Sequence, residues 1–291
     1  MAGPANLGRF LCDWPFVATV LLLFGLCSFA MLLPRATDVS ELGMRFVAPI
    51  RLLALLQLAL WPLLLVRVAS SMAGVGARAV LPLLPAIVGQ TQFGHHWLIA
   101  TPLMLAVVAL SWRAGFTLWQ ARALALLSAG QLLLWAASGH AIDYGTAAIA
   151  AYLVHELAAG LWLGSLLGLW LVAPTAGGAL GKVAPRVSQI AGWCVTGIVI
   201  SGAYLAYCGL GLNLTHLLYS SYGRTLLWKL ALVTGVVAIG GYNRYRLLPT
   251  LSDKVKSREL LRNVAVESLL LIVIIGVAAR LANTPPAHMA P

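Results

Sequence analysis

Charged residues are scarce in this sequence. Asp, Glu, Lys and Arg make up only 9% of the 291 residues, whereas hydrophobic residues make up 61% and the mean hydropathy is +0.91. In a soluble domain about 25% of all residues are charged, and they supply its water-facing surface. The composition therefore excludes a soluble globular domain and predicts an integral membrane protein, in which each span needs about 20 apolar residues.

Acidic residues are also few, and the cysteines are not grouped. There are 8 acidic residues against 19 basic ones, and the formal net charge is +11. Because the basic residues lie in short connections between apolar runs, they predict membrane topology rather than nucleic-acid binding. The four cysteines show no CxxC spacing, and no GxSxG, P-loop or HExxH motif is present, so no enzymatic activity is expected.

Apolar runs bounded by charged residues, proline and glycine predict the fold class. We expect an all-α polytopic membrane protein with eight transmembrane helices, because a single apolar segment satisfies its backbone groups inside lipid only as a helix. The segments 74–92 and 211–221 are expected to lie at the external interface or to re-enter the membrane. The predicted spans are about 14–34, 46–72, 94–112, 119–139, 146–171, 187–209, 224–243 and 261–282.

Lys and Arg indicate the orientation of these spans. They are concentrated in the loops after spans one, three, five and seven, which the positive-inside rule makes cytoplasmic, so both termini are expected to be periplasmic. His155 then lies roughly 12 Å below the external face. The other histidines lie on or near that face: His95, His96, His140, His216 and His288. Loops commonly collect histidine, yet the cytoplasmic loops are as long and contain none.

An internal repeat is visible in the two halves. The segment 91–110 resembles 220–239 when Gly94 is aligned with Gly223. We predict two tandem four-helix units in parallel orientation, residues 1–140 and 141–291, which form one membrane domain. In transporters built from repeats, binding sites tend to lie at the interface between the repeats.

Span five contains the most informative polar residues. Its glycine stripe, residues 160, 164 and 168, predicts the close approach of a neighbouring helix. At 100° per residue Glu156 points toward this stripe, whereas His155 points about 140° away from Gly160. An ionisable group at this depth costs a few kcal/mol, so a functional role is the first hypothesis for His155. The alternative is a neutral histidine that is hydrogen-bonded across helices.

Histidine and methionine on the external side favour copper as a ligand. His140 follows span four and forms a pair with His155 across consecutive antiparallel helices, while Asp143 between them is expected in an external loop. Imidazole binds several transition metals and thioether selects copper(I). The further candidate ligands are Met72, one of the adjacent pair His95 and His96, and His288 with Met289 in a short terminal tail that either recruits metal or is disordered; Met104 could equally be core packing.

Polar residues inside the other spans have simpler expected roles. Glu267 lies one to two turns inside span eight, and Asn243 or Arg244 is its expected interhelical partner. A structural ion pair is favoured there over a proton or ion exit path. Arg51, Arg67 and Lys229 lie near the ends of spans, where their side chains are expected to snorkel to the membrane surface.

The order of several short motifs is similar to that of a known family. The sequence resembles the copper-resistance protein D (CopD/PcoD) family, most strongly over about 138–286. The resemblance rests on SGHA at 138–141, VHELAAGLWLGSLLGL at 154–169, SYGRTLLWKLALV at 221–233, GYNRYRLLP at 241–249, and a last span that bears Glu267 and ends in NTPP. The first half matches more loosely, through MAG at 72–74 and TQFG at 91–94.

This resemblance implies a multi-pass protein of the bacterial inner membrane that moves periplasmic copper into the cytoplasm. The histidine positions of the family match His140 and His155. A periplasmic copper-binding protein is the expected partner, because the copper-binding domain fused to some relatives is missing from this chain. Two alternatives remain: a haem-b or quinol-linked redox protein with the two histidines as ligands, and a copper-binding assembly or sensor protein that transports nothing. The copper oxidation state and a homo-oligomer are left open.

Overall fold

The structure consists of helices. The computed structural model describes residues 4–32, 39–113, 115–138, 140–173, 180–211, 214–251 and 254–284, and no strand occurs within these ranges. The long helices are α1 (Pro4–Leu32), α2 (Val39–Ala73), α5 (Gln92–Ser111), α6 (Leu118–Ala136), α7 (Thr146–Val172), α8 (Leu180–Leu210), α10 (Ser221–Tyr242) and α11 (Lys254–Ala282). Short helical segments connect them: α3 (Ala77–Val80), η1 (Leu81–Leu83), α4 (Leu84–Gln90), η2 (His140–Tyr144), α9 (Leu214–Tyr219), the π-helical turn η4 (Asn243–Leu247) and η5 (Leu248–Thr250). The all-α fold class is confirmed.

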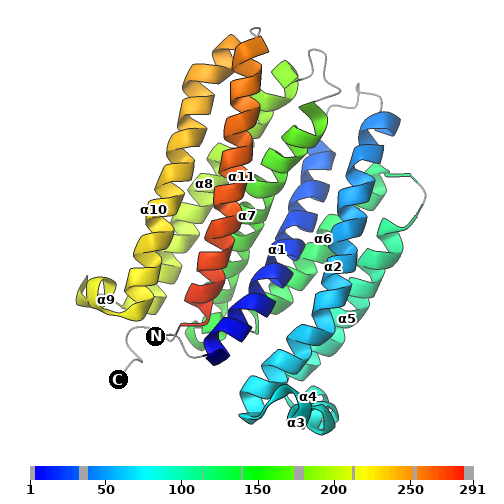
Figure 1. Cartoon of the computed structure of the whole chain (residues 1–291), viewed down its shortest axis with the longest axis vertical. Helices are drawn as coiled ribbons and strands as arrows, with labels where there is room; N and C mark the ends of the chain where they lie inside the picture. The colour runs from blue at the N-terminus through cyan, green and yellow to red at the C-terminus, as the bar shows by residue number, and fades with distance from the viewer. Residues whose placement is uncertain are drawn as a thin grey trace.

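Seven described helices are long and apolar enough to cross a membrane, so the chain is a multi-pass membrane protein. Helix α6 is not among them. It packs against α1 and α5 (Figure 1), but it carries Gln120, Arg122 and Gln131 within its 19 residues. The eighth span therefore stays a prediction.

Four helices start seven or more residues earlier than the hydropathy predicted. Helices α1 and α2 begin at Pro4 and Val39 instead of 14 and 46, and α8 and α11 begin at Leu180 and Lys254 instead of 187 and 261. The added residues of α8 and α11 include Lys, Arg and Glu. A helix continues past the apolar run that hydropathy detects, so the run marks the buried part and not the end of the helix.

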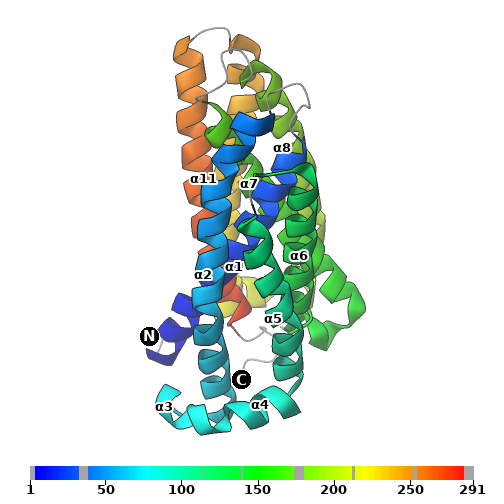
Figure 2. The ribbon, with the colours of Figure 1, turned by 90° about the vertical axis from the view of Figure 1, so that its right-hand side faces the viewer.

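The short segments α3, η1, α4 and α9 gather at one end of the bundle (Figure 1). Figure 2 shows α3 and α4 running across the foot of α2 and α5. The first described turn of α1 and the last turn of α11 lie toward the same end. This arrangement is expected if the segments 74–92 and 211–221 lie at the membrane surface. We call this end of the helix bundle the predicted external end.

The first turns of α5 and α10, the helices that follow these segments, have the same structure. The Thr91 hydroxyl accepts a hydrogen bond from the Gly94 N–H at 3.0 Å at the start of α5, and the Ser220 hydroxyl accepts one from the Gly223 N–H at 2.9 Å at the start of α10. A Cβ atom on Gly94 would lie 2.3 Å from the Val88 carbonyl oxygen. One on Gly223 would lie equally close to the carbonyl oxygens of the turn before it. The aligned glycines of the repeat therefore hold the same structural position.

The helices that precede the segments also end alike. Helix α2 is followed by Gly74 with φ +67°, and α8 by Gly211 with φ +66°. Glycine adopts this left-handed conformation without the steric cost that other residues meet, and it is common just after a helix. The local repeat is thus visible in the backbone, while the division into units 1–140 and 141–291 stays a prediction.

A backbone contact joins α1 to α7. A Cβ atom on Gly25 of α1 would lie 1.9 Å from the carbonyl oxygen of Gly160, and one on Gly164 would lie 2.1 Å from the Gly25 carbonyl carbon. The next glycine of the stripe, Gly168, faces the ring of Phe29. The neighbour that the glycine stripe predicts is therefore α1, and we call this contact the glycine seam.

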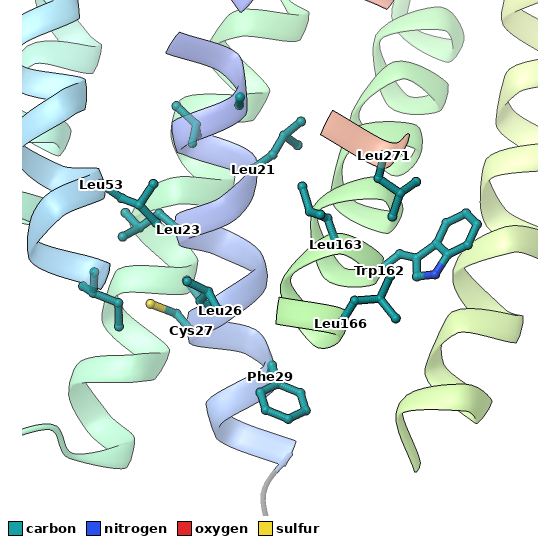
Figure 3. Close-up of a cluster of buried hydrophobic side chains, with 14 of the residues drawn as sticks. Leu21, Leu23, Leu26, Cys27, Phe29, Leu53, Trp162, Leu163, Leu166 and Leu271 are labelled. Carbon is teal, nitrogen blue, oxygen red and sulfur yellow. The ribbon is translucent and has the colours of Figure 1, made fainter. Parts of the chain in front are cut away.

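Apolar side chains fill the space around the seam. Figure 3 shows Leu21 of α1 pointing toward α7 and Leu23 pointing toward Leu53 of α2, with Leu271 of α11 on the far side. Leu163 points toward α1, whereas Trp162 points away from it, toward the other helices of the second half. Helix α7 thus buries one face against α1 and presents another to α8 and α10.

Candidate functional site

His155 lies inside the bundle on α7. It is nine residues after Thr146, or about 14 Å along the helix from its start. Its Nδ1 atom is 3.1 Å from the hydroxyl oxygen of Ser201 on α8. The Ser201 hydroxyl donates to the carbonyl oxygen of Gly197 at 2.6 Å, so Ser201 accepts from His155 Nδ1–H. The unprotonated nitrogen of the ring is therefore Nε2, the atom that can coordinate a metal ion.

Lys229 of α10 faces this nitrogen. Its Nζ atom is 3.3 Å from His155 Nε2 and donates to it. The expectation that Lys229 snorkels to the membrane surface is wrong, because its side chain turns into the bundle. Room for the ring comes from Gly202 of α8, where a Cβ atom would lie 3.1 Å from His155 Cε1.

Glu156 is the second ionisable residue of this region. Its side chain is only 7% exposed, and the Tyr152 hydroxyl one turn earlier hydrogen-bonds to it. The other carboxyl oxygen, Oε2, has no hydrogen-bond partner among the described residues. Lys229 lies within electrostatic range of the Glu156 carboxylate as well as in contact with His155. We call Tyr152, His155, Glu156, Ser201 and Lys229 the polar cluster.

Several predicted site residues lie away from the polar cluster. The backbone of His140 opens η2 just before α7, and Asp143 is exposed in the same turn. Met72 is 52% exposed at the last turn of α2. His95 turns back on its own connection, with Nε2 at 3.1 Å from the Gly89 carbonyl oxygen. His288 and Met289 lie outside the described residues.

His96 enters the bundle where His95 does not. Its Nδ1 atom is 2.6 Å from the Ser138 hydroxyl at the end of α6. The same side chain lines a small cavity together with Met104, Gln131 and Trp97. Adjacent residues of a helix point 100° apart, so only one of the two histidines could face inward, and the sequence did not show which.

The described residues contain no ready-made metal site. Nowhere in this part of the chain do three His, Cys, Asp or Glu side chains come together as ligands of one ion. The copper ligand set predicted from the sequence therefore stays a prediction, and its members inside the helix bundle, His155 on α7 and His96 and Met104 on α5, lie in separate places.

Glu267 forms a second polar centre farther along α11. It is 3% exposed, and the Asn243 side-chain amide donates a hydrogen bond to Oε1. Asn263 in turn donates to the Asn243 side-chain oxygen at 2.8 Å. The expected structural ion pair is wrong, because Arg244 instead donates to the Ser188 carbonyl oxygen at 3.0 Å. No described cation lies in salt-bridge contact with Glu267.

A cavity of about 360 Å³ adjoins Glu267. It lies among α7, α8, α10, α11 and the η4 turn, and apolar side chains make up most of its wall. Its polar lining comes from Glu267, Asn243, Arg244, Tyr245, Ser188 and Trp162. Because Arg244 and Tyr245 are exposed, the cavity opens at the end of the bundle opposite α3, α4 and α9.

Comparison with known proteins places this arrangement in a family. Residues 5–148 match the family described as "Copper resistance protein D-like, N-terminal domain", and residues 181–281 match "Copper resistance protein D". The chain belongs to the copper resistance protein D family. The sequence resemblance is thereby confirmed, and it extends over both halves.

Two relatives of this copper resistance protein D family member are informative. The chain is 27% identical to Copper resistance protein D of Pseudomonas syringae pv. tomato over 291 aligned positions, which cover 92% of this chain and 93% of the relative. It is 33% identical to Inner membrane protein YebZ of Escherichia coli K12 over 171 positions, which cover 55% of this chain and 57% of the relative. No solved structure matches. Together with the apolar helices, the relatives support a multi-pass inner-membrane protein related to copper resistance.

Sequence reasoning missed three members of the polar cluster. Ser201 and Tyr152 gave no signal, because isolated hydroxyl residues are common in apolar helices. Lys229 did give one, since it lies eight residues inside α10. A basic residue at that depth already indicates a partner or a site in the bundle.

Proposed function

We propose that this protein carries copper across the inner membrane from the periplasm to the cytoplasm. The observation that carries the proposal is the position of His155, whose unprotonated Nε2 points into the helix bundle and toward α10. Imidazole nitrogen is a good copper ligand, and the family is one of copper resistance. A ligand about 14 Å inside the bundle is suited to an ion in passage rather than to surface binding.

The polar cluster provides a way for a copper ion to bind His155 and to leave it again. In the copper-free protein Lys229 occupies the space next to Nε2 as a tethered cation. A copper ion that binds Nε2 displaces the ammonium group, which has an acceptor ready in the free Oε2 of Glu156. The ammonium group stays in the cluster, so the region gains the charge of the ion, and the Glu156 carboxylate beside the moved ammonium limits the electrostatic cost of that gain.

The external end supplies the entry in this proposal. Met72 is exposed there, and His140 lies six residues before the first residue of α7. His288 and Met289, outside the described residues, remain further proposed ligands. A soluble periplasmic copper-binding protein delivers the ion, and the basic loops at the other end receive it.

Copper uptake into proteoliposomes tests this function. His155→Ala should abolish uptake, because it removes the inward ligand. His216→Ala is the matched control, since that ring contacts the Leu210 carbonyl oxygen at 3.1 Å beside α9 and should leave uptake unchanged. Equal rates for the wild type and the His155 variant would contradict the proposal.

A visible spectrum of the purified protein separates the alternatives. A Soret band that is lost in His155→Ala would favour a haem-b protein. Bound copper without any uptake would favour an assembly or sensor protein. Uptake that requires His155 in a protein without a Soret band supports the transporter.

A further inference from the structure

The Glu267 cavity contains a buried carboxyl group without a cationic partner. Glu267 receives a hydrogen bond from Asn243, and the nearest basic residue of the wall, Arg244, is held by Ser188. A buried carboxylate without a counter-charge is strongly disfavoured in a membrane protein. Glu267 must therefore hold a proton or a small cation for at least part of the time.

The residues that line the cavity indicate whether Glu267 binds a proton or a small cation. No histidine, methionine or cysteine is among its described lining residues, so it offers no soft ligand for copper. Hard metal ions such as Mg²⁺ and Ca²⁺ need about six oxygen ligands. Glu267 is the single carboxyl group of the described wall, and the Asn243 amide turns its N–H toward it rather than its oxygen. The chemistry that remains is proton binding.

Water can reach this carboxyl group. A volume of about 360 Å³ has room for roughly ten water molecules at ~30 Å³ each. Trp162 lines the cavity, is 2% exposed, and its indole Nε1 finds no acceptor among the described residues. An orphaned buried donor in the wall indicates bound water there. The water-filled cavity would connect Glu267 to its opening beside Arg244 and Tyr245.

Few other groups could take the proton. Arg244 and Tyr245 of η4 are the other titratable residues of the described wall, and α7, α8 and α10 contribute none to it. Helix α1 also packs on α11, but its Asp13 is paired with Arg67 and accepts a hydrogen bond from Asn283 near the predicted external end. The proton exchange is therefore assigned to Glu267.

We propose that Glu267 is a proton-binding site that exchanges protons with the cytoplasm through this cavity, and that the exchange accompanies copper movement. The carboxylate takes a proton from cavity water and returns it to cavity water, with no other bond made or broken. The second part of the statement rests on the proposed copper transport. Two helices link the sites: α7 carries His155 and Trp162, and α10 carries Lys229 and leads into Asn243.

The η4 turn provides the place where α10 can respond. Single π-helical turns are frequent at functional sites, where they interrupt the regular hydrogen-bond ladder. Asn243, which donates to Glu267, is the first residue of this turn. When Lys229 leaves His155, a shift of α10 reaches Asn243 directly and changes the hydrogen bond that the carboxylate accepts.

Infrared titration of the copper-free protein tests the proton site by itself. The difference spectrum between acidic and alkaline buffer should contain a carbonyl band of a protonated carboxyl group that is lost in Glu267→Gln. Glu259→Gln on the same helix is the matched control, because that carboxylate is paired with Lys256 at 3.3 Å and bonded by the Tyr242 hydroxyl. An unchanged difference spectrum in Glu267→Gln would overturn the assignment.

Proteoliposomes with a trapped pH dye test the coupling. Copper addition should produce a transient change of pH on the cavity side in the wild type and in Glu259→Gln, the transient should be lost in Glu267→Gln, and Glu267→Asp should restore part of it. Copper uptake with an undiminished pH transient in Glu267→Gln overturns the coupling. A wild type without copper uptake refutes the proposed transport instead, and the infrared result still decides the proton site. Recovery of the transient in Glu267→Asp shows that the loss does not come from misfolding.

Discussion

Replacing Lys229 by leucine should tighten copper binding at His155. The Nζ atom of Lys229 is 3.3 Å from Nε2, and copper bound to that nitrogen would lie about 2 Å from it. Because Lys229 donates to the Nε2 lone pair, its ammonium group occupies the place where the ion would bind and must move away. At about 4 Å from a singly charged copper ion, the moved ammonium still repels it by about 4 kcal/mol at an effective dielectric constant of 20. Because 1.4 kcal/mol is a factor of ten in affinity, complete removal of this repulsion is worth roughly 1000-fold.

The measured gain should be smaller than this limit, because Lys229 can withdraw toward Glu156. We expect copper affinity to rise between about 10-fold and 1000-fold in Lys229→Leu. The assay is competition with a coloured copper chelator, carried out on the purified protein in detergent. Lys229→Arg keeps the charge and should show no gain.

A second control identifies the copper site. The gain should vanish when Lys229→Leu is combined with His155→Ala, because the charge then no longer opposes an ion at that nitrogen. An unchanged or weaker affinity in Lys229→Leu would refute the view that the lysine competes with copper for His155. An undiminished gain in the double variant would show that copper binds elsewhere.

Two further predictions concern the supports of the site and of the fold. Ser201→Ala should lower copper affinity by about 10- to 100-fold, because it removes the acceptor that fixes the His155 ring, and an unchanged chelator titration would contradict this. Gly25→Ala should destabilise the protein by about 1–3 kcal/mol in a denaturant titration, because the added Cβ would lie 1.9 Å from the Gly160 carbonyl oxygen. Gly235→Ala, with no atom within 4 Å of its added Cβ, should not, and equal losses in both variants would refute the seam.

Much of the helical framework could be predicted from local patterns. An apolar run of sufficient length forms a helix in lipid whatever surrounds it, so helices appear at each predicted span. The glycine stripe of α7 also predicted a close neighbour, since small residues on one face leave the backbone accessible. The aligned Gly94 and Gly223 were correctly identified as equivalent, because the same turn forms before each of them.

The partners of individual side chains could not be predicted in this way. Lys229 and His155 are 74 residues apart in the sequence, and their contact depends on how α7, α8 and α10 pack. The same holds for α1 as the neighbour at the glycine stripe, and for Arg244, which turns to Ser188 rather than to Glu267. Hydropathy and spacing describe one helix at a time, whereas these contacts depend on the rotation of each helix about its own axis.

The glycine seam has a mechanical consequence for the two polar centres. At Gly25 and Gly160 the backbones of α1 and α7 touch without intervening side chains, so these helices cannot move apart or slide there without losing the contact. Any tilt of one helix against the other must turn about that point. On α7, His155 lies on the side of this contact that faces the predicted external end, whereas Trp162 and the Glu267 cavity lie beside the contact or beyond it. A small rotation of α7 against α1 about the glycine seam therefore moves the two helices apart at one end of the bundle and brings them together at the other end.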